Sequence, residues 1–217
     1  MPSPDLPGGA RPFGRLRSFA RRGPLESCDL CGKELAEQHD HLVEPGARRL
    51  LCACGPCALL FSGPTNTKYQ RVPRDARPIP DFVMTDAQWD DLRIPINLAF
   101  FFRSSTQGRT IASYPSPAGA TESLLPLDAW QAIEEANPVL AGMQEDVEAL
   151  LVHRVGYARD LAPAEYYIVP IDQCFKLVGL IRTRWRGLSG GNEVWREIAH
   201  FFNDLKTRSA IRGEHNA

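Results

Sequence analysis

Cys28-Asp29-Leu30-Cys31-Gly32 and Cys54-Gly55-Pro56-Cys57 are two CxxC stretches, with 22 residues between Cys31 and Cys54. A CxxC turn presents two thiolates on one side of a tight backbone knuckle, and two knuckles complete a tetrahedron around a metal ion. The sequence therefore predicts one metal ion, held by Cys28, Cys31, Cys54 and Cys57.

This metal site organises a predicted module over residues 26–62. The segment has few large apolar side chains, so we expect it to fold around its metal. Structural zinc supplies roughly 10–16 kcal/mol in small zinc peptides. Arg48 to Ala53 is expected to form a strand, and Ala58 to Phe61 a first helical turn or a short strand. The module resembles zinc-ribbon and treble-clef knuckles.

Three further side chains compete for places at this site. Cys52 lies two residues before Cys54, an offset that suits a knuckle less well than the Cys54/Cys57 pair. His39 and His41 are also within reach along the chain. The sequence favours the four paired cysteines and leaves the roles of Cys52, His39 and His41 open.

Zinc and iron both accept four thiolates. The first knuckle, CxxCG, resembles that of rubredoxins, whose thiolates hold one iron for electron transfer. The second knuckle departs from the rubredoxin turn, because Pro56 is displaced and Ala58 stands where that family has glycine. We favour one structural zinc ion. The alternative is one iron ion, in a rubredoxin-like electron carrier fused to a docking domain.

The bulk composition describes a globular protein. The chain has 217 residues, a hydrophobic content of 43% and a formal net charge of −1. This charge argues against a nucleic-acid partner, and no stretch approaches the roughly 20 apolar residues of a membrane span. Five of the cysteines are clustered at metal-ligand spacing, which indicates a reducing compartment. We expect a cytoplasmic location.

Composition also divides the chain. Residues 1–25 read as a basic flexible tail, in which Phe13, Leu16 and Phe19 recur at steps of three among five arginines. This tail is a candidate docking element for an acidic protein partner. Residues 63–81 are rich in proline and read as a linker, and residues 209–217 read as a second flexible tail.

Residues 82–208 are predicted to form an α+β domain with an antiparallel sheet and C-terminal helices. Thr85 is expected to cap a helix over 86–92, and Asp128 a helix over 129–136. The expected strands are 96–103, 110–114, 147–155 and 166–169. Apolar stripes predict helices over 171–184, with Phe175 on the buried face, and from residue 192 or 193 onward, with Trp195 buried.

Catalytic motifs are weak throughout the chain. The segment with His41 between the CxxC pairs resembles zinc-stabilised HNH nucleases, but the helix after the second knuckle lacks their metal-binding His or Asn. The letters of a GxSxG elbow occur at 187–191, without the buried strand that this motif requires before it. Arg184 and Arg186 are candidates for an anion site. We favour a protein without catalytic activity.

Longer stretches carry a family resemblance. CDLCGKEL, IPDFVMTDAQWDDLRIPINLAFFF, PSPAGATESLL and WRGLSGGNEVWREIAHFFNDL occur between Cys28 and Arg208. They resemble a bacterial family associated with gene clusters for nickel–iron uptake hydrogenases. The resemblance implies a metal-binding accessory protein that assists the assembly or function of a hydrogenase through contacts with a hydrogenase subunit or maturation factor. It implies no residue roles.

Overall fold

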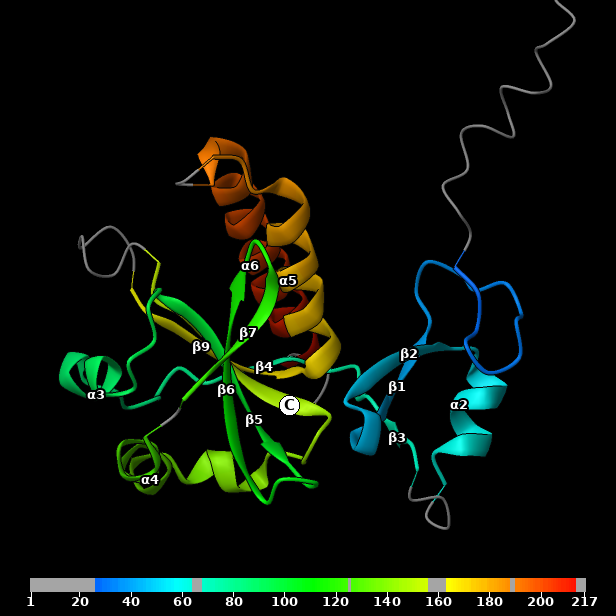
Figure 1. Cartoon of the computed structure of the whole chain (residues 1–217), viewed down its shortest axis with the longest axis horizontal. Helices are drawn as coiled ribbons and strands as arrows, with labels where there is room; N and C mark the ends of the chain where they lie inside the picture. Colours follow the sequence, from blue (N-terminus) through cyan, green and yellow to red (C-terminus); the bar gives the residue numbers. More distant parts are fainter. Residues whose placement is uncertain (1–25, 64–67, 125, 156–162, 188–189, 214–217) are drawn as a thin grey trace, which may run out of the picture.

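A computed structural model describes residues 26–63, 68–124, 126–155, 163–187 and 190–213. The predicted basic tail, with Phe13, Leu16 and Phe19, lies outside these residues. The described chain forms a small unit around the cysteines beside a larger α+β unit, as Figure 1 shows. The predicted α+β class is confirmed.

The small unit is a three-stranded sheet with one helix. Its strand order is β2-β1-β3, and both pairings are antiparallel. The elements are β1 Asp40–Glu44, β2 Arg49–Ala53, β3 Gln70–Arg71 and helix α2 Gly55–Phe61, with a 3-10 turn, η1 Pro45–Ala47, inside the β1–β2 hairpin. Arg48 ends this turn with φ 51, a left-handed conformation that reverses the chain into β2.

The large unit is built on a six-stranded antiparallel sheet of order β4-β9-β8-β5-β6-β7. Its strands are β4 Arg77–Pro78, β5 Leu98–Ser104, β6 Arg109–Ser116, β7 Gly119–Ser123, β8 Glu148–His153 and β9 Glu165–Pro170. The four predicted strands are present, and β7 was not expected. β3 and β4 lie in the stretch predicted to be a linker, and each belongs to a different sheet.

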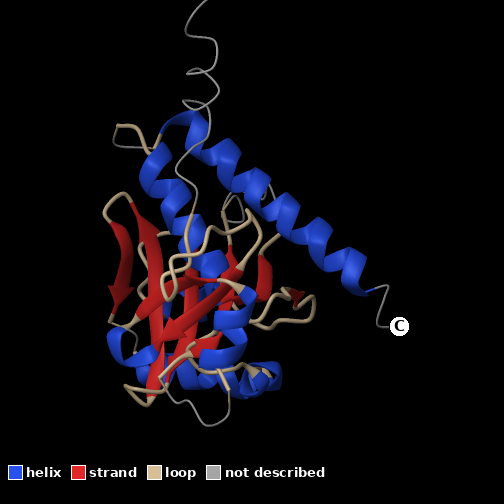
Figure 2. Cartoon of the chain, turned by 90° about the vertical axis from the view of Figure 1, so that its right-hand side faces the viewer, coloured by secondary structure: helices blue, strands red, loops and turns tan. Residues whose placement is uncertain are grey.

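Helices pack on both faces of the large sheet, and Figure 2 shows the last two of them as long helices that cross beside the strands. Strand alternation sends Leu98 and Phe100 into a core with α5 and α6, whereas Ala99 and Phe101 enter a core with α3 and α4. The helices are α3 Asp86–Asp91, α4 Leu127–Ala136, α5 Ile171–Arg184 and α6 Gly191–Gly213, and the 3-10 turn η2 Pro138–Gly142 follows α4. No helix among the described residues is long and apolar enough to cross a membrane.

Helix ends follow their local chemistry. Thr85 caps α3 as predicted, in a reciprocal capping box with Gln88. Helix α4 begins at Leu127, one position before the predicted cap Asp128. Helix α6 continues through residues 209–213, where a tail was expected.

The apolar stripes of the last two helices differ from the prediction at their edges. Phe175 and Trp195 are 40% and 42% exposed, because each lies at the margin of a stripe whose centre faces the sheet. The central residues of both stripes, including Cys174, Ile181, Val194 and Leu205, are buried as predicted.

Candidate metal centre

The first knuckle is a closed backbone turn that places Cys28 and Cys31 together. Gly32 N donates to Cys28 O at 2.8 Å, and Cys28 N donates to Lys33 O at 2.8 Å. Gly32 has φ +75, a left-handed conformation that glycine adopts without steric cost. A β-bridge between Ser27 and Glu34 fixes the base of this turn.

The second knuckle joins strand β2 to helix α2. Cys54 is the N-cap residue of α2, with extended backbone angles, and Pro56 occupies the first turn, where its missing N–H costs no hydrogen bond. Ala58 N donates to Cys54 O at 2.8 Å and closes the first helical turn. This turn carries Cys57 back toward Cys54.

The two knuckles converge on one point. Their four cysteines, Cys28, Cys31, Cys54 and Cys57, each offer a sulfur, and these sulfurs lie within 4.8 Å of one another. Cys31 Sγ and Cys54 Sγ are 3.7 Å apart. Four sulfurs held by zinc at 2.3 Å in a tetrahedron lie roughly 3.8 Å apart, so the arrangement fits a four-thiolate metal site.

The cysteine cluster is part of the core of the small unit. Cys28, Cys54 and Cys57 are buried, and they pack with Leu42, Leu51 and Ala58. Cys31 is exposed and forms the outer corner of the cluster. A metal ion here would replace the larger apolar core that this unit lacks.

Two cysteines of the cluster, Cys28 and Cys57, have pKa values shifted in opposite directions. Burial acts to raise the pKa of Cys28, but backbone N–H groups of Cys54, Leu30 and Cys31 stabilise its thiolate and lower the pKa to about 6. Hydrogen bonding with Cys54, followed by burial, raises the pKa of Cys57 to about 12. A metal ion bound by these sulfurs would favour their thiolate forms.

A buried carboxylate anchors the surrounding chain. Asp40, at the start of β1, accepts hydrogen bonds from Arg71 Nη2 at 2.9 Å and Arg74 Nη2 at 2.8 Å. Burial acts to raise the pKa of Asp40, and the two arginines outweigh it, so this pKa is lowered. The ion pairs hold β3 and the segment after it against the hairpin.

The other ligand candidates from the sequence do not join the four cysteines. His39, His41 and Cys52 form a second group, in which one donor atom from each residue lies within 4.8 Å of the others. Cys174 belongs to α5 and is fully buried in the core that α5 and α6 form on the large sheet, where burial raises its pKa well above the ordinary value. It is a core residue of the large unit.

The loop after α5 has a packing explanation. Arg184 Nη1 contacts Glu193 Oε1 at 2.8 Å, so this arginine is paired with the first turn of α6. Gly190 has φ +85, and a Cβ there would lie 2.8 Å from Val194 Cγ1 and 3.1 Å from the Trp185 ring. Gly190, at the variable position between Ser189 and Gly191 of the GxSxG-like stretch, thus allows close packing, and Ser189 lies outside the described residues.

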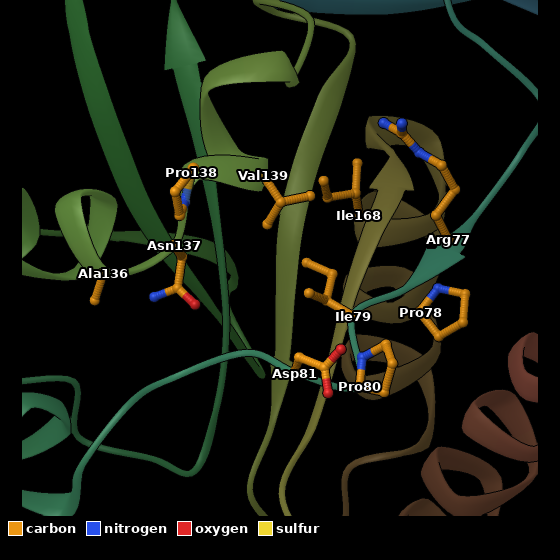
Figure 3. A pocket seen from close by; sticks show the side chains of 10 residues that line it. All are labelled: Arg77, Pro78, Ile79, Pro80, Asp81, Ala136, Asn137, Pro138, Val139 and Ile168. Carbon is orange, nitrogen blue, oxygen red and sulfur yellow. The ribbon is translucent and has the colours of Figure 1, made fainter.

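A cleft of about 420 Å³ lies between the β4 segment and the end of α4 (Figure 3). Its lining residues are Arg77, Pro78, Ile79, Pro80, Asp81, Ala136, Asn137, Pro138, Val139 and Ile168. Asn137 binds the Val83 backbone with both ends of its amide, and Arg77 is paired with the buried Glu148. The side chains of Asn137 and Arg77 are therefore engaged in contacts that stabilise the fold.

Comparisons with known proteins give one match. The profile of DUF5947, a family of unknown function, matches residues 27–209. No match was found among curated proteins or among solved structures. The matched range includes the four-cysteine cluster and the whole six-stranded sheet.

Proposed function

The chain belongs to the DUF5947 family, and we propose that it is a metal-binding accessory protein that acts by contacting another protein. The main support for this proposal is that four cysteine sulfurs meet within the core of the small unit, those of Cys28, Cys31, Cys54 and Cys57. We propose these four as the ligands of one zinc ion. The knuckle, hairpin and helix follow one another as in treble-clef zinc modules, which supports a structural role for the metal.

Exposed apolar side chains beside the metal support a role in protein contacts. Leu59 and Leu60 of α2 are 67% and 72% exposed, two and three positions after the proposed ligand Cys57. A metal-ordered helix with such side chains offers a partner a fixed apolar contact. The basic tail would add attraction toward an acidic surface and would mainly speed encounter.

The partner that we propose is a subunit or maturation factor of a nickel–iron hydrogenase. The support is the family resemblance of the stretches between Cys28 and Arg208. We propose a cytoplasmic location, because free cysteines at metal-ligand spacing suit a reducing compartment.

Purification of the tagged full-length chain from its native host under anaerobic conditions tests these proposals. We expect a colourless protein that contains zinc and co-purifies with a hydrogenase component. Removal of residues 1–25 should weaken this co-purification and leave fold and metal intact. Leu59→Asp with Leu60→Asp should weaken it as well, whereas Leu124→Asp, a control at a 94% exposed position of the large unit, should not.

Equal recovery of the same partners by the tail deletion and by the α2 variant would show that neither element docks the partner. The accessory role itself would be contradicted if the full-length chain retrieved no partner and instead turned over a substrate, with turnover abolished by His41→Ala or Ser189→Ala.

A second candidate is an iron–thiolate electron carrier. The exposure of Cys31 favours it, because an exposed ligand shortens the path of an electron to a docked partner. An iron protein would be red or brown as purified, with one iron per chain and no zinc. A colourless zinc protein would exclude this candidate.

A further inference from the structure

The β1–β2 hairpin carries potential metal ligands on the face opposite its leucine core. His41 and Cys52 are direct partners in the antiparallel register, so their side chains lie on the same face. His39 precedes His41 by two positions, and one donor atom from each of the three residues lies within 4.8 Å of the others. The buried Leu42 and Leu51 belong to the other face.

Both histidines have one ring nitrogen already engaged. His39 Nδ1 lies 2.9 Å from the carbonyl oxygen of Ala36, an acceptor, so this nitrogen carries the proton. His41 Nδ1 lies 3.0 Å from Asp172 Oδ2, to which it donates in the same way. Metal-binding histidines typically donate one N–H to a carbonyl or carboxylate, which leaves the other nitrogen as the ligand. Both Nε2 atoms are therefore available to a metal.

The free nitrogen of His39 lacks a hydrogen-bond partner within the described part of the chain, although it is buried. The nearest charged atom recorded for it is Glu26 Oε2, at 3.6 Å. A proton on this nitrogen, or a metal ion bound to it, would each balance the negative charge of the Glu26 carboxylate. Asp172 Oδ1 is also buried without a hydrogen-bond partner among the described residues, and its carboxylate adds negative charge beside His41.

The third donor, Cys52, is held in place through its backbone. Cys52 N donates to Asp29 Oδ2 at 2.7 Å, and Asp29 N donates to Cys52 O at 2.9 Å. Asp29 belongs to the first knuckle of the four-cysteine cluster. The position of the Cys52 thiol is therefore fixed by the fold of the first metal module.

We infer that His39 Nε2, His41 Nε2 and Cys52 Sγ form a second site, for a divalent ion of the zinc class. Zinc would hold such donors roughly 3.4–3.7 Å apart, and one donor atom from each of the three residues already lies within 4.8 Å of the others. Imidazole and thiolate ligands select zinc-class ions over magnesium or calcium. Asp172 is a positioning residue that fixes the tautomer and the ring orientation of His41.

The second site differs from the first in being open. Three protein ligands leave a fourth coordination position, the arrangement of reactive or exchangeable zinc sites, whereas four cysteines close the first site. His39, His41 and Asp172 line a cavity of about 1100 Å³ between the small unit and helix α5. The fourth position is therefore available to water or to a donor atom from a partner. This site goes beyond the proposed structural zinc.

Metal titration of the reduced, metal-free full-length chain tests the inference, with zinc for stoichiometry and cobalt for spectroscopy. We expect two ions per wild-type chain and one in His39→Ala/His41→Ala, with the cobalt–thiolate spectrum of the four-cysteine site retained. His200→Ala, a control at an exposed position of α6, should bind two ions. Asp172→Ala should lower the affinity for the second ion by about 10–100-fold. Asp172→Asn retains a hydrogen-bond acceptor for His41 and should lower this affinity by less.

One bound ion in the wild-type chain would overturn the second site and leave the first intact. Two ions bound with unchanged affinity by the double histidine variant would overturn it as well. A variant that fails to fold would lose both ions, and Asp172→Ala then provides the independent test, because it alters neither knuckle.

Discussion

His41 Nδ1 of strand β1 lies 3.0 Å from Asp172 Oδ2 in the first turn of α5. This contact joins the cysteine-bearing unit to the large sheet unit, and it orients a histidine that faces the cavity between them. A change in the conformation of the small unit would therefore alter a contact made by the first turn of α5. The variants below separate the contributions of the two units.

Loss of one paired cysteine should remove the metal from the four-cysteine site. Cys28→Ser and Cys57→Ser each leave three thiolates, and we expect residues 26–62 to loosen while the six-stranded sheet stays folded. Hydrogen exchange and metal analysis measure the two effects. Cys174→Ala is the matched control, because Cys174 is a buried cysteine outside the cluster. This variant should retain the metal of the four-cysteine site. Full metal content in both serine variants would contradict the ligand assignment.

Cys52→Ser should leave the four-cysteine site loaded. Cys52 belongs to the group with His39 and His41, so its replacement should remove only the second ion. Metal analysis of this variant beside Cys54→Ser, which should lose the first site, makes the comparison. Equal loss of the first ion in the two variants would show that Cys52 is a ligand of the first site.

Acid should destabilise the large unit partly through His153. Burial lowers the pKa of His153 from its ordinary 6.5, although Glu165 at 3.3 Å acts in the opposite direction. The folded state therefore favours the neutral ring, and stability present above pH 6.5 is lost as the pH falls toward the folded-state pKa.

His153→Phe should reduce this loss. Phenylalanine keeps the stack on Phe202, whose ring centroid lies 3.8 Å from that of His153, and it does not titrate. Urea midpoints at pH 7.5 and pH 5.5 measure the effect, with His200→Phe as the exposed control. An equal fall in the midpoint for wild type and His153→Phe would show that another group carries the acid sensitivity.

Gly190→Ala should destabilise the chain by about 1–3 kcal/mol, because the added Cβ meets Val194 and Trp185 at a left-handed backbone position. Gly179→Ala is the matched control, since nothing lies within 4 Å of its Cβ position in the interior of α5. Alanine there should stabilise by about 0.5–1 kcal/mol. Thermal unfolding of both variants gives the comparison, and a neutral Gly190→Ala would contradict the packing explanation.

The sequence was most informative where a pattern is local. Helix α5 spans Ile171–Arg184 as predicted, because Pro170 precedes an uninterrupted apolar stripe. The convergence of the two knuckles also followed from spacing alone. By contrast, β3 and β4 have two residues each, too few for a periodic signal, and β7 lies in a segment rich in glycine, serine and threonine.

The second group of ligands depends on long-range placement. His39, His41 and Cys52 read as competitors for one site, because the sequence does not give the register that sets His41 opposite Cys52. Asp172 had no functional signal, since only the packing of α5 beside the small sheet brings it to His41. Such pairings arise from tertiary contacts that no local pattern encodes.

Residues 72–76 connect β3 of one sheet to β4 of the other. Most surface loops accept insertions at little cost, but this connection is anchored along its length. Val72 is buried, Arg74 is paired with Asp40, and Ala76 packs on the core of α5 and α6. An inserted residue would displace one of these anchors. The length of this five-residue connection therefore limits how far apart the two sheets can lie, and it sets the width of the cavity that His39, His41 and Asp172 line. Relatives with a longer or shorter connection here should have cavities of different width.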